Sequence, residues 1–163
     1  MIWGDPLPLD DTFARQLLLL NRLYKASNSI YRELAARFDL NDATFWILHI
    51  ISSHSADPLT QSDLSTEWFI PLQTVHSAVQ TLVKRGLLHL AGIPGTKNRK
   101  QILLTEEGRL FASKVVDRVD EIEKSAFMHL TPEERDTYLH LFKKHLAALR
   151  AEEQRVLDQY ENQ

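Results

Sequence analysis

Apolar residues recur at helical spacing along most of this chain. Residues 10–38 predict one long helix, because they contain no Pro or Gly and their apolar pattern fits a helix: Phe13, Leu17, Leu20, Leu23, Tyr24, Ile30, Tyr31 and Leu34. A second helix is predicted from Asn41 or Asp42 to about Ser53. Because its side chains are apolar on nearly every side, this second helix must be buried.

Two more long helices are predicted in the last third of the chain. Glu106 and Glu107 place acids in the first turn of one, which continues to about Met128. Residues 131–134, Thr-Pro-Glu-Glu, form a capping box with Pro at the first helical position, and they begin a helix that runs close to the C-terminus. The apolar stripe of this last helix consists of Leu139, Phe142, Leu146, Leu149 and Val156.

The middle of the chain predicts two short helices. Thr60 can cap the first of these helices. Asp63, in the first turn, can accept a hydrogen bond from the backbone N–H of Thr60 in return. The second is predicted to start at Pro71, whose fixed φ suits a first helical position, and to end at a cationic turn closed by Gly86. Two short helices joined by a turn predict a helix-turn-helix.

A β-hairpin is predicted directly after this helix-turn-helix. Residues 87–90 and 101–104 are two short, mostly apolar runs, and the segment between them contains Gly92, Pro94 and Gly95. The predicted fold class is therefore mainly α: a winged helix-turn-helix, with a three-helix core and a β-hairpin wing, flanked by long terminal helices.

The outer face of the second short helix has the chemistry to bind DNA. Val75, Val79 and Leu82 recur at helical spacing and predict one inward face, which leaves the polar residues outward. No acid lies on that outer face, and Gln, Thr, Ser and His can hydrogen-bond base edges and phosphates in a major groove. This pattern predicts a recognition helix. The alternative is an ordinary solvated polar face.

Positive charge is concentrated in the same region. Residues 59–105 hold five Lys or Arg against two acids, a formal charge of +3, whereas the whole chain is at −3 and the remainder is therefore at −6. A flexible basic hairpin suits phosphate contact and insertion of Arg into a minor groove, although exposed cations are also often only solvated. The candidate DNA contacts are Gln61, Ser62, Gln73, Thr74, His76, Ser77, Gln80, Lys84, Lys97, Asn98, Arg99 and Lys100.

Composition excludes several other classes of protein. No apolar run is longer than the four residues of 17–20, which is too short to cross a bilayer, and the N-terminus lacks a signal-peptide pattern, so we expect a cytoplasmic protein. No nucleotide-binding, nucleophile-elbow or metalloprotease motif is present, so we expect no enzyme. The pairs His49 and His54, and His140 and His145, are each five residues apart and do not share one helix face. We therefore expect no metal site and no cofactor.

The order of these parts resembles the MarR family of transcriptional regulators from end to end. Residues 59–64, Leu-Thr-Gln-Ser-Asp-Leu, are similar to the family's first short helix. Residues 73–75 with Leu82 and residues 86–88 look like its recognition helix and strand entry, and Leu104-Thr105 with Gly108 looks like its signature after the wing. One departure is visible: the family's wing has Asp-x-Arg where this chain has Thr96-Lys97-Asn98, and Arg99 is displaced by one position.

The resemblance implies a dimeric repressor or activator that binds pseudo-palindromic promoter DNA and is often released by a small aromatic or anionic ligand. We expect a single domain over residues 1–163, with its DNA-binding part at about 42–105 and dimerisation helices at about 10–38 and 106–160. The long helices have more apolar surface than the small winged unit can cover. The simplest way to bury that surface is against a second copy of the chain, so we expect a homodimer. A monomeric helical bundle is the alternative.

A ligand site is predicted near the presumed junction of the dimer helices and the winged helix. The candidate ligand-binding residues are Tyr31, Phe45, Trp46 and His49, for which ordinary core packing is the alternative. The chain has no cysteine, so we expect regulation by a noncovalent ligand and not by thiol oxidation. The alternative function is that of a winged-helix module that binds another protein and not DNA.

Overall fold

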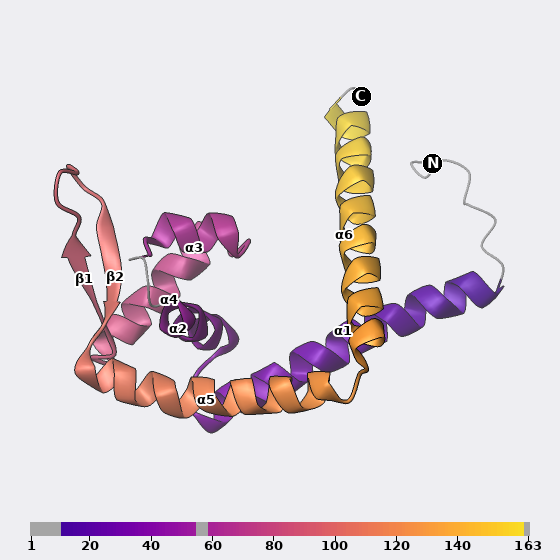
Figure 1. Ribbon diagram of the computed structural model, residues 1–163. Coiled ribbons are helices and arrows are strands. Elements are labelled where there is room, and N and C mark those ends of the chain that lie inside the picture. Colours follow the sequence, from indigo (N-terminus) through magenta and orange to yellow (C-terminus); the bar gives the residue numbers. More distant parts are fainter. Residues whose placement is uncertain (1–10, 55–58, 162–163) are drawn as a thin grey trace. The chain divides into compact units, whose positions relative to one another are not determined.

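The computed structural model describes residues 11–54 and 59–161, and it has the predicted mainly helical winged fold (Figure 1). Residues 55–58, which the sequence predicts as a loop, lie outside the described residues. The chain divides into two compact units, Met1–Asp117 and Arg118–Gln163, with the boundary inside α5. The elements are α1 (Asp11–Arg37), α2 (Asp42–Ser53), α3 (Gln61–Glu67), α4 (Leu72–Lys84), β1 (Leu88–Gly92), β2 (Lys100–Leu104), α5 (Glu106–Met128) and α6 (Pro132–Glu161).

The core of the first unit forms around α2. This helix buries Phe45, Ile47, Leu48 and Ile50, as its apolar sequence predicts. It packs against α4, whose inward face consists of Val75, Ala78, Val79 and Leu82. Burial of a large aliphatic or aromatic side chain contributes on the order of 1.5–3 kcal/mol, so the contact between α2 and α4 is a principal source of stability in this unit.

Capping hydrogen bonds are present at three of the predicted helix starts. Asn41 caps α2, because its Oδ1 accepts the backbone N–H of Thr44 at 2.9 Å. Thr60 and Asp63 form the capping box of α3: the backbone N–H of Thr60 donates to Asp63 Oδ2 at 2.8 Å, and the N–H of Asp63 donates to Thr60 Oγ1 at 3.3 Å. The capping box of α6 is also present, between Thr131 and Glu134.

Both ends of α4 are defined by backbone geometry. The sequence predicts Pro71 as the first helical residue. In the structure it is instead the N-cap, with φ −53° and ψ 132°. The proline ring fixes only φ, so ψ can take the extended value of a capping residue. At the other end Gly86, with φ +73°, completes a Schellman motif in which Leu87 N–H donates to the Leu82 carbonyl at 3.0 Å.

Arg85 ties the end of α4 to its neighbours. Its Nη1 donates to the Asp39 carbonyl at 2.6 Å, and its guanidinium lies 5.3 Å from the centre of the Phe111 ring. Cation–π contacts of this kind contribute on the order of 0.5–1 kcal/mol at exposed sites. The last turn of α4 is therefore held to the turn before α2 and to α5.

The predicted hairpin is confirmed as β1 and β2, which pair antiparallel with Leu88 opposite Leu104 and Gly92 opposite Lys100. The base of this wing is joined to the segment before α3, because Ile102 N–H donates to the Leu59 carbonyl at 2.8 Å. An isolated bridge between Thr60 and Gln101 continues that pairing. The wing and the helix-turn-helix thus share backbone hydrogen bonds.

The start of α5 packs closely against residues 86 and 87, which lead into β1. Thr105 Oγ1 donates to the Gly86 carbonyl at 2.6 Å and accepts the backbone N–H of Gly108 at 2.9 Å. A Cβ added to Gly108 would lie 1.9 Å from the Leu87 carbonyl oxygen. Gly108 is therefore required for close approach of two backbones, and Thr105 for capping; this gives a physical reason for the Leu-Thr-x-x-Gly pattern of residues 104–108.

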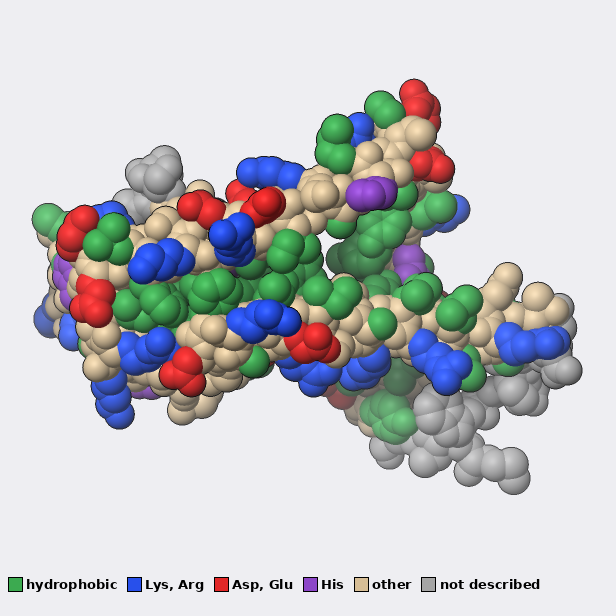
Figure 2. Space-filling model, turned by 90° about the horizontal axis from the view of Figure 1, so that it is seen from below, with side chains coloured by type: hydrophobic (Ala, Val, Ile, Leu, Met, Phe, Trp, Pro, Cys, Tyr) green, Lys and Arg blue, Asp and Glu red, His purple; other side chains and the backbone are tan. Residues whose placement is uncertain are grey.

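Several large apolar side chains remain exposed on α1 and α6. On α1 they include Leu18, Leu23 and Ile30, and α6 has no buried residue at all. Figure 2 shows uncovered hydrophobic side chains in a view from below, with charged side chains beside them. Among the described residues, no helix combines the length and the apolar character needed to cross a membrane.

Substitution of Gly108 tests the closure at the start of α5. We expect Gly108→Ala to lower the free energy of unfolding by about 1–3 kcal/mol or more, because the new Cβ meets backbone atoms that cannot rotate away. Gly92→Ala is the matched control: a Cβ there meets nothing within 4 Å, so stability should change by no more than about 0.5 kcal/mol. Urea denaturation of both variants measures the difference, and equal stability of the two would contradict this account.

Candidate nucleic-acid interface

The outward face of α4 is polar and free of acids. Gln73, His76 and Ser77 are exposed, and Thr74 and Gln80 are half-buried at the edges of the face. Lys84 is exposed in the last turn. The buried residues of α4 all lie on its α2 side, so the five polar residues and the lysine are presented together. These residues thus share one outward surface, and their role as DNA contacts stays a prediction.

The start of α3 joins this face. His76 Nδ1 lies 3.2 Å from Gln61 Oε1. An amide oxygen can only accept, so the imidazole nitrogen is the donor in this hydrogen bond. Ser62 is exposed in the next position of α3. The polar surfaces of the two helices are therefore continuous.

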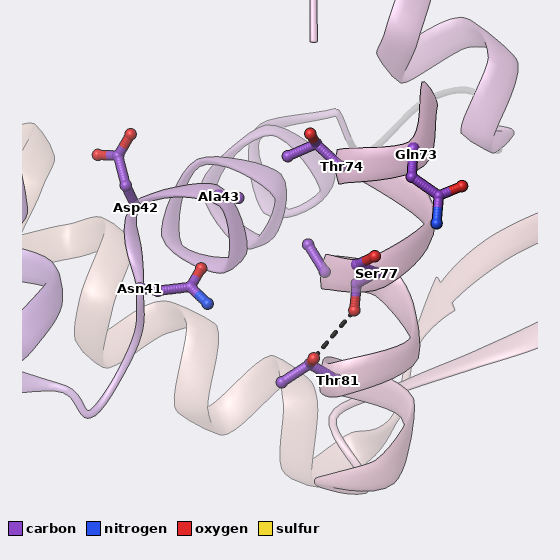
Figure 3. Close-up of a pocket in the computed structure, with 8 residues that line it drawn as sticks. Asn41, Asp42, Ala43, Gln73, Thr74, Ser77 and Thr81 are labelled. Atoms are coloured by element: carbon purple, nitrogen blue, oxygen red, sulfur yellow. Dashed lines mark hydrogen bonds between the residues drawn. The ribbon is translucent and has the colours of Figure 1, made fainter. Parts of the chain in front are cut away.

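A hollow of about 420 Å³ lies beside the α4 face, between that helix and the start of α2. Figure 3 shows Asn41, Asp42 and Ala43 on its α2 side and Gln73, Thr74, Ser77 and Thr81 on its α4 side. Thr81 Oγ1 donates to the Ser77 carbonyl at 2.9 Å, so this hydroxyl is partly used within the helix.

The sequence predicts Asn41 and Asp42 only as a helix start. Their place beside α4 follows from the packing of α2, for which the sequence has no local signal. One consequence is electrostatic: α4 itself has no acid, but Asp42 places a carboxylate across the hollow from it. The carboxylate of Asp42 disfavours phosphate on that side of α4, whereas the cations of this region lie in the last turn of α4 and on the wing.

The wing tip presents its predicted cations to solvent. Lys97, Asn98, Arg99 and Lys100 are all exposed. The tip is ordered by hydrogen bonds: Ile93 N–H donates to the Arg99 carbonyl at 3.0 Å, and Gly95 turns the chain with φ +77°. Three cations and an amide thus extend from a turn of defined shape.

Arg99 is directed toward the start of α3. Its Nη2 lies 4.0 Å from Asp63 Oδ1, in a largely exposed pair that contributes little energy. Hydrogen bonds from the backbone and side chain of Thr60, helped by the charge of Arg99, hold the pKa of Asp63 below its ordinary value. The carboxylate therefore stabilises the fold at neutral pH, and this contribution is lost as the pH falls through the lowered pKa.

The four candidate ligand-binding residues form one aromatic cluster. Ring centres of Tyr31 and Trp46 are 4.8 Å apart, and those of Trp46 and His49 are 5.8 Å apart. Phe45 meets Trp46 edge to face at 5.4 Å but is itself fully buried. Tyr31, Trp46 and His49 are half-buried and form the accessible part of the cluster, whereas Phe45 supports it from the core.

Comparison with known proteins agrees with this architecture. The model of the MarR family matches residues 38–97, which run from the turn before α2 to the wing tip. No curated protein is similar enough to be matched to this chain.

Many solved structures share the fold. A complex of Staphylococcus aureus MepR with DNA has a TM-score of 0.70 and 22% identity, over 81% of this chain and 96% of that one. A MarR-family regulator from Listeria monocytogenes, solved with a 26mer DNA, has a TM-score of 0.68 and 20% identity, over 83% and 89%. Bordetella bronchiseptica BpsR, whose DNA binding is regulated by 6-hydroxynicotinic acid, has 0.63 and 24%, over 78% and 89%.

Proposed function

We propose that this chain, which has a MarR-family sequence over residues 38–97 and the fold of MarR-family regulators, is a dimeric, sequence-specific, DNA-binding transcription regulator. The observation that supports this most directly is the acid-free polar face of α4, continuous with α3 and accompanied by an exposed basic wing. MepR and the Listeria regulator were both solved on DNA, in the same fold. A regulator of this kind would work where the DNA is, which agrees with a cytoplasmic location.

The contacts divide into two kinds. Gln73, Thr74, His76, Ser77 and Gln80 would face base edges in the major groove, where amide, hydroxyl and imidazole groups can distinguish base pairs. Lys84 and the wing residues 97–100 would face phosphates or the minor groove, where they add affinity but little sequence information. Gln61 and Ser62 would contact the sugar-phosphate backbone of the DNA beside α4.

A pair of variants separates these two roles. Against a duplex selected from random DNA by the wild-type protein, we expect Gln73→Ala to cost about 1–3 kcal/mol of binding, with little change on random DNA. Lys97→Ala should weaken binding to both kinds of DNA alike and lower the slope of log affinity against log salt by about one. Equilibrium binding at several salt concentrations measures both.

Two results would overturn this assignment. If selection enriches no sequence and binding to DNA is not salt-sensitive, the chain does not bind DNA specifically, and a winged-helix module for protein binding becomes the better account. If Gln73→Ala weakens selected and random DNA equally, α4 does not recognise bases.

A homodimer is the second part of the proposal. The α6 stripe is exposed, with Phe142 at 40% and Leu146 at 52%, and α1 also exposes leucines. Exposed apolar surface of this extent is typical of an interface. A two-fold dimer would also present two copies of α4 to a pseudo-palindromic site with half-sites about one helical turn apart.

Charge on the stripe should break this dimer. We expect Phe142→Glu with Leu146→Glu to yield a monomer or an unfolded chain, because a carboxylate in an apolar contact is not solvated. Lys144→Glu is the control, since it adds an acid to the opposite side of the same helix and should leave the dimer intact. Light scattering at micromolar concentration measures the mass, and a folded wild-type monomer would refute the dimer.

Release by a small aromatic or anionic ligand, with the regulator acting as a repressor, is the third part. The support is the half-buried cluster of Tyr31, Trp46 and His49, and the absence of any cysteine for a thiol switch. The similar BpsR is regulated by such a molecule. An aromatic acid could stack on Trp46 while its carboxylate accepts a hydrogen bond from the Tyr31 hydroxyl or the His49 ring.

Binding of a ligand can be followed with 6-hydroxynicotinic acid and benzoate as probes. We expect one of them to change tryptophan fluorescence in the wild type but not in Trp46→Phe. The same probe should lower the affinity for DNA by the factor by which DNA lowers the affinity for the probe. A silent fluorescence signal with both probes would count against this site. Release of DNA by peroxide, with both methionines intact, would contradict noncovalent regulation.

A further inference from the structure

One exposed residue of α4 does not fit a polar recognition surface. The exposed positions of this helix are Leu72, Gln73, His76, Ser77, Thr81 and Lys84. Five of these six side chains are polar or charged, and only Leu72 is apolar. Its exposed fraction is 56%, so it is not part of the core between α4 and α2.

The position of Leu72 is the first residue of α4, directly before Gln73 and one turn before His76. Side chains four residues apart lie on the same side of a helix, so Leu72 stands in a row with His76. That row faces α3, because His76 is hydrogen-bonded to Gln61. Leu72 thus extends the polar surface that α3 and α4 share toward the start of the helix.

The start of a recognition helix is the part that reaches base edges in the major groove. Leucine has no hydrogen-bond donor or acceptor and cannot bind phosphate or a polar base edge. The one apolar group that a base pair presents in the major groove is the 5-methyl of thymine. Contact with that methyl removes both apolar surfaces from water, and contact with any other base leaves a polar base edge without a hydrogen-bond partner.

We propose that Leu72 is a specificity-determining residue that contacts the 5-methyl group of a thymine, at a base pair next to the one contacted by Gln73. This inference rests on the proposed function, since it assumes that α4 enters the major groove. It adds what the polar residues cannot supply: a preference for thymine that depends on one methyl group and on no hydrogen bond.

The test removes that methyl from the DNA. A duplex is selected from random DNA by the wild-type protein, and each thymine in turn is replaced by deoxyuridine, which differs only in lacking the 5-methyl group. In the wild type we expect one thymine in each half-site whose replacement weakens binding about fourfold, the effect of one buried methyl-sized group. In Leu72→Ala the same replacement should have no effect.

A conservative variant keeps the test independent of folding. Leu72→Met retains an apolar side chain of similar reach, so it should keep the thymine effect that Leu72→Ala loses. Because Leu72 is exposed, both variants should have the wild-type circular dichroism spectrum and unfolding midpoint. Loss of the thymine effect in Leu72→Ala with retention in Leu72→Met therefore assigns the contact to this side chain.

Failure of this inference can be distinguished from failure of the proposed function. If a sequence is selected but every deoxyuridine effect is the same in wild type and Leu72→Ala, the contact with thymine is refuted while α4 remains a recognition helix. If no sequence is selected, DNA recognition fails, and the role of Leu72 fails with it.

Discussion

The packing of α4 against α2 determines which residues of this chain can meet another molecule. Val75, Val79 and Leu82 are buried against the apolar side chains of α2, and this fixes the rotation of α4 about its axis. A helix rotated by a third of a turn would expose valines and bury glutamines, at a cost of several kcal/mol in apolar burial and unsatisfied amides. The polar outward face of α4 is thus a consequence of the core.

Backbone contacts extend this control to the wing. The Schellman motif at Gly86 ends α4, the hydroxyl of Thr105 accepts from Gly108 and donates back to Gly86, and Ile102 pairs with Leu59 ahead of α3. The contacts of Thr105 with Gly86 and of Ile102 with Leu59 join segments that are distant in sequence but adjacent in the winged helix. The wing is therefore attached at both ends of the helix-turn-helix, and its cations can have a reproducible position relative to α4.

Much of this arrangement follows from the sequence because its signals are local. Helix periodicity, the capping boxes at Thr60 and Thr131, the glycine stop at Gly86 and the hairpin break at Gly92, Pro94 and Gly95 each act within a few residues. Pro71 differs by one position from its prediction, as the N-cap of α4 and not its first residue, because fixing φ does not fix ψ. The predicted and observed starts of α4 differ by only one residue, and a proline suits both positions.

Features that depend on tertiary packing could not be predicted from the sequence. Asn41 lies across a hollow from Ser77 and Thr81 only because α2 packs beside α4 there (Figure 3). The sequence predicts Asp63 as a capping residue, but its proximity to Arg99 depends on how the wing folds back. The contact between Gly108 and Leu87 is likewise invisible in sequence, where a glycine early in a helix looks merely unfavourable.

The same α2 helix offers a physical route between the two proposed sites. Trp46 and His49 are half-buried with the aromatic cluster, while Phe45, in edge contact with Trp46, is fully buried in the core against which α4 packs. A closely packed core does not deform continuously, so a ligand that repositions the Trp46 ring must either leave Phe45 in place or shift it together with its neighbours. A ligand of the first kind would bind without consequence for DNA. Only a ligand that favours the second arrangement, by more affinity than the shift costs, can change the position of α4 and so regulate DNA binding.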